Sequence, residues 1–469
     1  MIFSSIFFLF VFLPLTLLAY FFVPKKAKNV VLLICSLIFY AWGEPVYVLL
    51  MVFSILYNYI SGVEIDFYRR RGKTAQLRFI FWLAVGVNLG ILGFFKYYGF
   101  LLENLNRILP FTIKYTPLAL PIGISFYTFQ TLSYIIDVYR GTVDVQKNLI
   151  NFGLYITMFP QLIAGPIVRY ADIEKQLTDR KVTREGFGQG VKFFLKGLAK
   201  KVLLANNIGM AYTAISALPA DQFSTLAAWI GAIAYTLQIY FDFSGYSDMA
   251  IGLGKMFGFT FMMNFDHPYI SSSITEFWRR WHISLSTWFR EYVYIPLGGN
   301  RVGTAKAIRN LFIVWILTGF WHGAAWNFVV WGLYYGVLLV LEKYVLRPVI
   351  ERLPSAVRHL YALFFIVIGW VIFSAPSLSA AARYIRVMFG GGSAASGSAG
   401  VYYLYNYLLV LVIGAVCSGP GVTAEMNRCI VAEERWKRVF VTGVYAAAFV
   451  CSIAFLVNAT YNPFLYFRF

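Results

Sequence analysis

Charged residues, cysteine and histidine are all scarce in this chain of 469 residues. Only 13% of the residues are charged and 59% are hydrophobic, whereas soluble domains have roughly 45–50% apolar and about 25% charged residues. The composition therefore excludes an ordinary soluble protein. Because the apolar excess extends along the whole chain, it indicates a single integral membrane domain over residues 1–469 rather than a soluble domain with an anchor.

Sequence patterns that define several other kinds of site are also absent. The chain has no HExxH or HxH pattern, so we predict no metal site. It has no GxSxG pattern, which argues against a serine triad. The four cysteines show neither CxxC spacing nor a dense framework, and we assign no function to Cys35, Cys417, Cys429 and Cys451. Residues 1–22 lack the basic start and the cleavage site of a signal peptide, so we expect an uncleaved first span.

The excess of positive charge gives an expected orientation. The formal net charge is +19, and basic proteins can bind nucleic acid. Here the basic residues cluster between apolar runs, as they do in cytoplasmic loops beside an anionic leaflet. We therefore expect no nucleic-acid partner and place the clusters at 25–28, 69–73, 169–201 and 428–438 in the cytoplasm. Both chain ends then lie outside, with residues 461–469 as an extracytoplasmic tail.

The apolar runs predict an all-α fold. They are consistent with about ten to twelve membrane segments in a polytopic helical bundle. Several runs are short for one crossing and 308–341 is long, so we expect some re-entrant or tilted helices, which are tolerated only inside protein or along a cavity.

Residues 272–300 form a different kind of segment. Ser273 and Glu276 have the spacing of a capping box, and Gly298 with Gly299 can end a helix. Aromatic and aliphatic residues follow helical spacing on one side, and charged residues occupy the other. We predict one amphipathic helix here, lying at the membrane interface or dipping into it.

Two of the four histidines are candidate functional residues. His322 lies within an uncharged run, 311–341, about 16 Å along a helix from its start, which is mid-membrane depth. An ionisable group there is costly, so it faces a cavity or pairs with a neighbouring helix. Gly319 and Gly323 would let a ligand or backbone approach. A buried neutral imidazole suits a general base.

The other histidines and two aspartates have weaker patterns. His282 lies between the aromatic and charged sides of the predicted amphipathic helix, and taken alone a structural role is favoured. His267 precedes a proline and is expected in a turn, and His359 is expected at the interface. Asp242 and Asp248 could line a polar cavity, although pairing with Arg279 or Arg280 is favoured.

Five long strings of the sequence are similar to a known family. They are LPIGISFYTFQTLSYIIDVYRG at 120–141, FPQLIAGPIVRY at 159–170, QIYFDFSGYSDMAIGLG at 238–254, TEFWRRWHISLSTWFREYVYIPLGGNR at 275–301 and FWHGAAWNFVVWG at 320–332. They resemble the membrane-bound O-acyltransferase family, and within it the bacterial branch that contains the membrane subunits of alginate, cellulose and peptidoglycan O-acetylation. The likeness extends over most of the chain.

The resemblance implies a mechanism and its residues. The catalytic histidine of the family falls on His322, and a second polar position falls on His282. The helices would surround a funnel from the cytosol to the outer face. Acetyl-CoA would be the donor substrate, with no bound cofactor. The C-terminal string Phe464 to Phe469 resembles an F-x-Y-x-x-F motif whose tyrosine, here Tyr466, is similar to an acyl relay.

The resemblance also implies the setting. We expect a multi-pass protein of a bacterial inner membrane that passes acetyl groups outward for O-acetylation of an envelope polysaccharide. Its partners would be a periplasmic esterase-like transferase of the SGNH type and the machinery that makes and exports the polymer. The developing charge on the thioester oxygen needs donors, and Asn327, Trp281 and Trp326 are candidates. A lipid-directed acyltransferase and a transporter or flippase are the alternative functions.

Overall fold

A computed structural model describes residues 1–392, 397–431, 434–458 and Leu465. Within these residues the regular structure is helical, and an isolated bridge joins Phe265 and Trp281. The all-α prediction is therefore confirmed. Tyr466 and the rest of the predicted tail, apart from Leu465, lie outside the described residues.

The chain forms two compact units. The first comprises Met1–Phe194 and Met249–Met262, and the second comprises Leu195–Asp248 and Met263–Phe469. The expected single domain stays a prediction. The first unit contains the short helices η1 (Phe8–Phe12) and η2 (Lys25–Ala27) and the helices α1 (Leu13–Phe22), α2 (Lys28–Gly43), α3 (Val48–Arg70), α4 (Thr74–Asn106), α5 (Ile124–Arg140), α6 (Leu149–Thr157), α7 (Phe159–Leu162) and α8 (Tyr170–Thr178).

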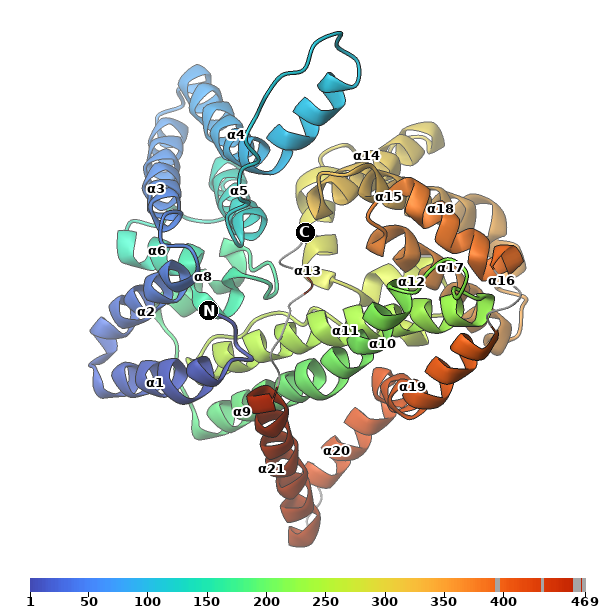
Figure 1. The fold of residues 1–469 in the computed structure, drawn as a ribbon. Helices are drawn as coiled ribbons and strands as arrows, with labels where there is room; N and C mark the ends of the chain where they lie inside the picture. Colours follow the sequence, from blue (N-terminus) through green and yellow to red (C-terminus); the bar gives the residue numbers. More distant parts are fainter. Residues whose placement is uncertain (393–396, 432–433, 459–464, 466–469) are drawn as a thin grey trace. The chain divides into compact units, whose positions relative to one another are not determined.

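Two long helices have residues in both units, α9 (Arg184–Ala199) and α11 (Thr225–Met256). The remaining helices belong to the second unit (Figure 1). They are η3 (Lys200–Ala205), α10 (Asn206–Ser216), η4 (Pro268–Ile270), α12 (Ile274–Arg280), α13 (Ile283–Phe289), η5 (Arg290–Tyr294), α14 (Thr304–His322), α15 (Trp326–Leu341), η6 (Glu342–Leu346), α16 (Arg347–Ile350), α17 (Ser355–Ser374), α18 (Leu378–Arg386), η7 (Val387–Gly391), α19 (Gly397–Ser418), α20 (Gly421–Val431) and α21 (Arg435–Asn458).

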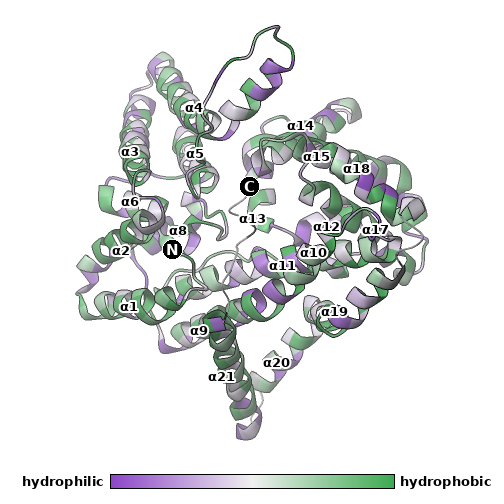
Figure 2. Cartoon of the chain, viewed as in Figure 1, coloured by the Kyte–Doolittle hydropathy of each residue, from purple (hydrophilic) through white to green (hydrophobic). Residues whose placement is uncertain are grey.

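Eight helices of the described chain are long and apolar enough to cross a membrane. A shorter apolar helix covers Phe8–Phe22, and the expected ten to twelve segments included such short runs. In Figure 2 hydrophobic residues cover most of the length of these helices. α11 has 83% of its apolar window buried, whereas α4 and α21 each have 17%. α4 and α21 therefore present apolar side chains outward, as lipid-facing helices do. The protein is a multi-pass membrane protein.

In the first unit, the backbone conformation of a glycine sets the end of helix α5. It ends at Gly141, whose φ of 74° is the left-handed conformation of a helix C-cap. A Cβ at this glycine would lie 2.5 Å from Nη1 of Arg69, and that guanidinium donates to the carbonyl of Val138 at the end of α5. The left-handed conformation therefore favours glycine at position 141, and a side chain there would also displace the Arg69 guanidinium.

Candidate active site

The long apolar run around His322 forms a helical hairpin rather than one spanning helix. α14 ends at His322, and α15 begins at Trp326 and packs against it (Figure 1). The two helices approach closely because a Cβ at Gly319 would lie 2.3 Å from the carbonyl oxygen of Phe328. At Gly332 a Cβ would lie 2.2 Å from the carbonyl oxygen of Trp315. The stretch from residue 311 to His322, from which we predicted its depth, lies within α14, and the depth itself stays a prediction.

His322 is buried among aromatic rings at the turn of this hairpin. Its exposed fraction is 4%. The imidazole centroid lies 5.0 Å from the rings of Trp321 and Trp331 and 5.2 Å from that of Phe373. A Cβ at Gly323 would lie 2.2 Å from the ring of Phe328. From the sequence we expected Gly319 and Gly323 to let either a ligand or a backbone segment approach. In the structure, the backbone and the ring of Phe328 occupy the space beside them.

The predicted amphipathic helix is also broken, at His282. α12 ends at Arg280 and α13 begins at Ile283, so the expected continuous helix over 272–300 is wrong. Its expected N-terminus is confirmed, because Ser273 Oγ accepts from the backbone N–H of Glu276 at 3.0 Å. His282 has φ 46°, a left-handed conformation that is uncommon for residues other than glycine. Pairing of Trp281 with Phe265, and a bond from Ile283 N–H to Asn264 O at 3.0 Å, hold this break.

The His282 imidazole is oriented by Asn264. Its Nδ1 lies 3.2 Å from Oδ1 of Asn264. That oxygen also accepts from the backbone N–H and hydroxyl of Ser284, at 3.2 and 2.8 Å. In the tautomer that donates from Nδ1 to this oxygen, Nε2 carries the lone pair. Burial lowers the pKa of His282 to about 3, so the ring is neutral and only weakly basic at physiological pH.

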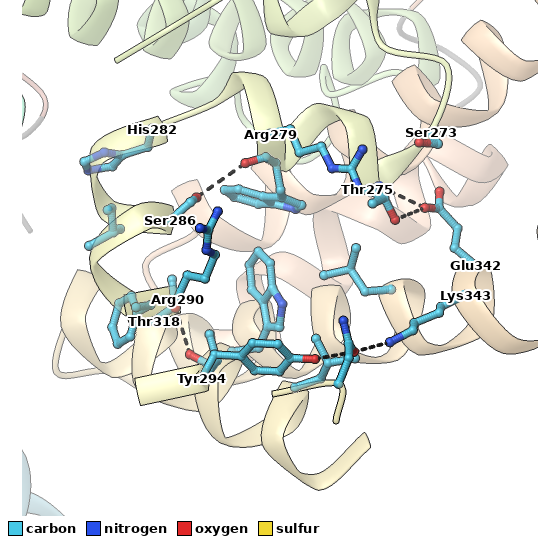
Figure 3. A pocket seen from close by; sticks show the side chains of 18 of the residues that line it. Ser273, Thr275, Arg279, His282, Ser286, Arg290, Tyr294, Thr318, Glu342 and Lys343 are labelled. Atoms are coloured by element: carbon cyan, nitrogen blue, oxygen red, sulfur yellow. Dashed lines mark hydrogen bonds between the residues drawn. The ribbon is translucent and has the colours of Figure 1, made fainter. Parts of the chain in front are cut away.

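Both histidines line one cavity of about 670 Å³ in the second unit. Figure 3 shows part of its lining, with His282 on one side and Glu342 and Lys343 on the other. Trp321 contacts both imidazoles, with centroid distances of 5.8 Å to His282 and 5.0 Å to His322. The structure therefore brings together two histidines that lie 40 positions apart, one between α12 and α13 and the other at the end of α14.

The cavity wall is rich in cations. Arg279, Arg290, Lys343, Arg347 and Arg358 line it, against Glu342 and Glu351 as the acidic residues among its described lining. Trp278 contributes an indole Nε1 that is buried and has no hydrogen-bond partner within the described chain. Such a site offers a positive field and a neutral N–H donor in an apolar setting, which suits an anionic substrate that develops charge on oxygen.

Glu342 fixes the first turn of α12. It is 4% exposed, and its carboxylate accepts from the backbone N–H groups of Ile274 and Thr275, at 2.5 and 2.9 Å, and from the Thr275 hydroxyl at 2.7 Å. A carboxylate at a helix N-terminus satisfies unpaired donors and complements the helix dipole. Glu342 therefore connects the end of α15 to the helix that leads into His282.

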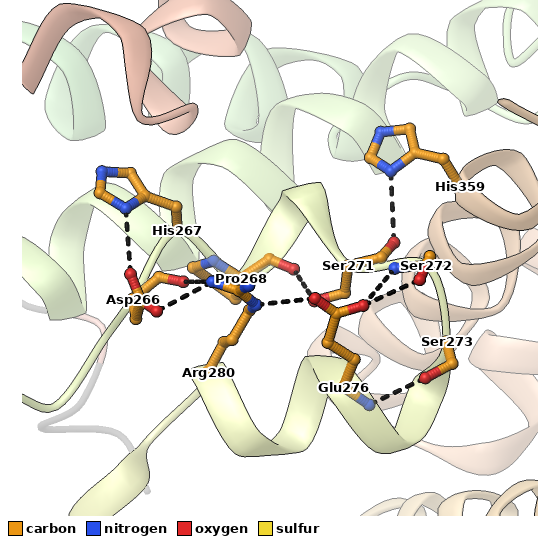
Figure 4. Close-up of polar contacts among 9 residues, drawn as sticks. All are labelled: Asp266, His267, Pro268, Ser271, Ser272, Ser273, Glu276, Arg280 and His359. Carbon is orange, nitrogen blue, oxygen red and sulfur yellow. Dashed lines mark hydrogen bonds and ion pairs between the residues drawn. The ribbon is translucent and has the colours of Figure 1, made fainter. Parts of the chain in front are cut away.

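A second network, shown in Figure 4, supports the other side of α12. Arg280 donates to Glu276 Oε1 at 3.0 Å and to Asp266 Oδ2 at 2.8 Å. Glu276 in turn accepts from Ser272 N–H and Oγ, each at 2.9 Å. His359 Nδ1 lies 3.2 Å from the carbonyl oxygen of Ser271. These contacts make α12 a rigid support for the strained turn at His282.

Comparison with known proteins identifies the family. The sequence model described as "MBOAT, membrane-bound O-acyltransferase family" matches residues 142–381. The chain belongs to the membrane-bound O-acyltransferase family. It is 42% identical to "Probable alginate O-acetylase AlgI" of Pseudomonas putida over 100% of both chains, and 46% identical to the protein of that name in Pseudomonas aeruginosa over 84% of this chain and 76% of that one. It is 36% identical to "Peptidoglycan O-acetyltransferase" of Helicobacter pylori over 83% of this chain and 80% of that one.

The family assignment agrees with the resemblance seen in the sequence, and it makes the protein an acyltransferase. The matched region contains His282, His322 and every residue lining the cavity. The catalytic roles of the two histidines and of Tyr466 stay predictions. Among the described residues, no group of three or more histidine, cysteine or acidic side chains lies close enough to hold a metal ion.

The three predicted oxyanion donors lie elsewhere in this acyltransferase. Asn327 Nδ2 donates to the carbonyls of Phe373 and Ala375, at 3.3 and 3.0 Å. Trp326 is half exposed, and Trp281 packs at 4.7 Å on the ring of Trp370. None of the three is among the residues that line the cavity. Trp278, an aromatic residue of the predicted helix, is among the lining residues.

The two aspartates also have other partners than expected. Asp242 forms an ion pair with Lys201, and Asp248 with Lys200 at 2.7 Å. The predicted pairing with Arg279 or Arg280 is therefore wrong. Asp242 Oδ2 accepts from the backbone N–H of Leu465 at 2.8 Å. His267 is in a left-handed turn before Pro268, as expected, with Nδ1 3.3 Å from Asp266 Oδ1.

Arg279, Arg290, Glu342 and Lys343 are lining residues that sequence reasoning did not assign to the site. The two arginines lie on the charged side of the predicted helix. Glu342 and Lys343 directly follow the uncharged run 311–341. An acidic residue that directly follows a long uncharged run was the sequence feature that could have marked Glu342 as a candidate.

Proposed function

We propose that this acyltransferase takes acetyl from cytosolic acetyl-CoA and passes it across a bacterial inner membrane for O-acetylation of an envelope polysaccharide. The observation that carries the proposal is the cavity that joins His282 and His322 under a cationic wall. The relatives named as alginate and peptidoglycan O-acetylating enzymes support a polysaccharide as the final acceptor. No cofactor is required, because the thioester supplies the activated acyl group.

The cationic wall supports an anionic donor. Coenzyme A carries phosphate groups, which arginine binds through charge-assisted and often bidentate hydrogen bonds. Arg279 and Arg290 lie on α12 and η5 at the cavity, and Lys343 lies across it on η6. In the proposed pose these side chains hold the phosphates, and the thioester extends toward the histidines.

We assign the chemistry to His322 as general base and to Tyr466 as acyl relay. The phenol oxygen of Tyr466 attacks the thioester carbonyl as His322 takes its proton. The tetrahedral intermediate collapses, the C–S bond breaks, and His322 returns the proton to the departing thiolate. A serine hydroxyl of a periplasmic SGNH-type transferase then attacks the acetyl-tyrosine ester, the bond to the phenol oxygen breaks, and Tyr466 takes up the serine proton and is regenerated as the phenol. The indole N–H of Trp278 would stabilise the oxyanion.

The contacts of Leu465 support a role for the tail. Its N–H bonds to Asp242 on α11. The next residue on α11, Phe243, packs edge-on against the imidazole of His282 with centroids 4.8 Å apart. The backbone position that precedes Tyr466 is thus anchored on the helix that supports His282.

Substitution of Tyr466 tests the relay. Tyr466→Phe keeps the ring but removes the nucleophile, so we expect normal protein in the membrane and no acetyl on the polymer. Mass spectrometry of the C-terminal peptide, after incubation with labelled acetyl-CoA, should show one acetyl group in the wild type and none in the variant. Wild-type polymer acetylation by Tyr466→Phe would exclude the relay. Label recovered on membrane lipid rather than polymer would instead indicate a lipid-directed enzyme.

A further inference from the structure

The first unit contains a second cavity, of about 880 Å³, with a different chemistry. It is formed by the end of α1, the start of α2, the start of α6 and the connection between α8 and α9. Five basic side chains line it, and none of its described lining residues is acidic. They are Lys25, Lys26, Lys28, Arg180 and Lys181. The fold therefore joins two basic segments that lie about 150 positions apart.

Little of this charge is neutralised. Lys25 pairs with Asp179 at 3.0 Å, and both side chains are largely exposed. In the part of the chain that the structure describes, no ion pair involves Lys26, Lys28, Arg180 or Lys181. Like charges brought together in this way repel one another, and a bound anion would relieve that repulsion.

Arg180 is held in place with one donor unused. Its Nε donates to the carbonyl oxygen of Phe257 at 3.1 Å and to the Tyr20 hydroxyl at 3.2 Å. Its guanidinium stacks over the ring of Phe259 at 4.3 Å. Nη2 is buried and has no hydrogen-bond partner among the described residues. A buried guanidinium N–H without a partner costs free energy, so it indicates a missing acceptor.

The cavity is a constructed feature rather than a gap between loose loops. Asn29 Nδ2 donates to Asn151 Oδ1 at 2.7 Å and to the Leu177 carbonyl at 2.8 Å, which connects α2, α6 and α8. The ammonium group of Lys28 lies 4.6 Å from the centroid of Tyr20. These contacts fix the walls of the cavity and the position of the Lys28 ammonium group before any ligand binds.

From these contacts we infer that the cavity binds the phosphate group of an anionic phospholipid at the cytoplasmic surface of the membrane. Phosphate matches both the charge and the unused Arg180 donor. A lipid is favoured over a soluble phosphate because Phe21 and Phe22, at the end of α1 beside the cavity, are 46% and 84% exposed. Acyl chains can cover these rings while the headgroup meets the lysines. Basic pockets beside spanning helices are suited to anionic headgroups.

The inference can be tested on the full-length protein in a neutral detergent. Native mass spectrometry would count bound phosphatidylglycerol and phosphatidylcholine during titration with each lipid. We expect the wild type to prefer phosphatidylglycerol. Lys26→Gln/Lys181→Gln changes two exposed side chains and should leave folding intact. Each surface charge contributes about fivefold to the affinity for an anionic lipid, so the loss of two should weaken phosphatidylglycerol binding about 25-fold. Binding of phosphatidylcholine should be unchanged.

A matched variant controls for net charge. Arg71→Gln/Lys73→Gln removes two exposed charges from the same unit and from another cluster predicted to be cytoplasmic, and it should not change lipid binding. Equal phosphatidylglycerol affinity in the wild type and Lys26→Gln/Lys181→Gln would overturn the site. A further titration adds inorganic phosphate or coenzyme A to the lipid-bound protein. Displacement of phosphatidylglycerol at comparable concentrations would assign the cavity to a soluble phosphate and overturn the lipid assignment.

Discussion

The two histidine turns of the second unit differ in how they hold their imidazoles. His282 is in a strained left-handed conformation, and its Nδ1 is bound to Asn264 Oδ1. His322 is in the turn of a close-packed hairpin, surrounded by the rings of Trp321, Trp331 and Phe373. Asn264 fixes one ring nitrogen of His282, and burial makes that imidazole a weak base. Aromatic rings fix the plane of the His322 imidazole. On this contrast we assign proton transfer to His322 and positioning to His282.

The largest effect is expected from His322. In His322→Ala the general base is lost, which typically costs about 10²–10⁴ in rate. Polymer-bound acetyl in a complemented deletion strain should fall to background, while immunoblotting shows a normal amount of protein in the membrane. Substantial acetylation at a normal protein level would remove His322 from the mechanism and with it the contrast between the two turns.

Trp278 should have the next largest effect. Trp278→Phe keeps a ring to pack against Trp315 and Trp331, at 4.7 and 5.5 Å in the native protein. It removes the N–H that we assign to the oxyanion. Loss of one such donor costs about 10²–10³ in kcat, so release of coenzyme A should slow by that order while KM for acetyl-CoA changes little. A raised KM with unchanged kcat would show that Trp278 binds the donor instead.

A moderate effect is expected at His282, and two substitutions separate its possible roles. His282→Gln keeps a side chain that can hydrogen-bond to Asn264, whereas His282→Ala removes the contact. We expect His282→Gln to retain more thioester turnover than His282→Ala, and both to exceed His322→Ala. If both lose as much turnover as His322→Ala, then His282 takes part in the chemistry and the proposed division of roles is wrong.

The sequence predicted the membrane bundle and the family, and the length of the run 308–341 indicated that it is not one simple crossing. It predicted neither the break at His282 nor the position of the turn at His322. Hydrophobic spacing continues through His282, and no charge marks the turn within the run around His322. The breaks depend on contacts between distant residues. Phe265 pairs with Trp281, and Gly319 packs on the backbone of Phe328. Local patterns contain no information on such contacts.

The sequence also did not predict the partners of the two aspartates. The arginines at 279 and 280 and the lysines at 200 and 201 offered equal charge to Asp242 and Asp248. Coulomb attraction between unit charges depends on their distance and not on the residue type. The packing of η3 against α11 therefore decides that the lysines, and not the arginines, pair with the two aspartates. The carboxylate of Glu342 bonds to Ile274, 68 positions away, for the same reason. The residues of the cavity wall could thus be recognised individually in the sequence, but their arrangement around one cavity could not be predicted.

The smallest effect is a dependence of stability on pH that arises from His282. The folded pKa of about 3 lies below the ordinary 6.5, so below pH 6.5 the unfolded chain takes up a proton that the folded protein excludes. Stability therefore falls as the pH falls from about 6.5 toward 3, by at most about 1.4 kcal/mol per pH unit from this group. His282→Gln lacks this group, so its Tm in detergent should fall less steeply than that of the wild type between pH 6.5 and 4.5. Between pH 7.5 and 8.5 His282 is neutral in both states, and the Tm difference between the two proteins should be constant. A Tm difference that is also constant below pH 6.5 would mean that His282 takes up a proton in the folded protein, and the neutral positioning role would then be wrong.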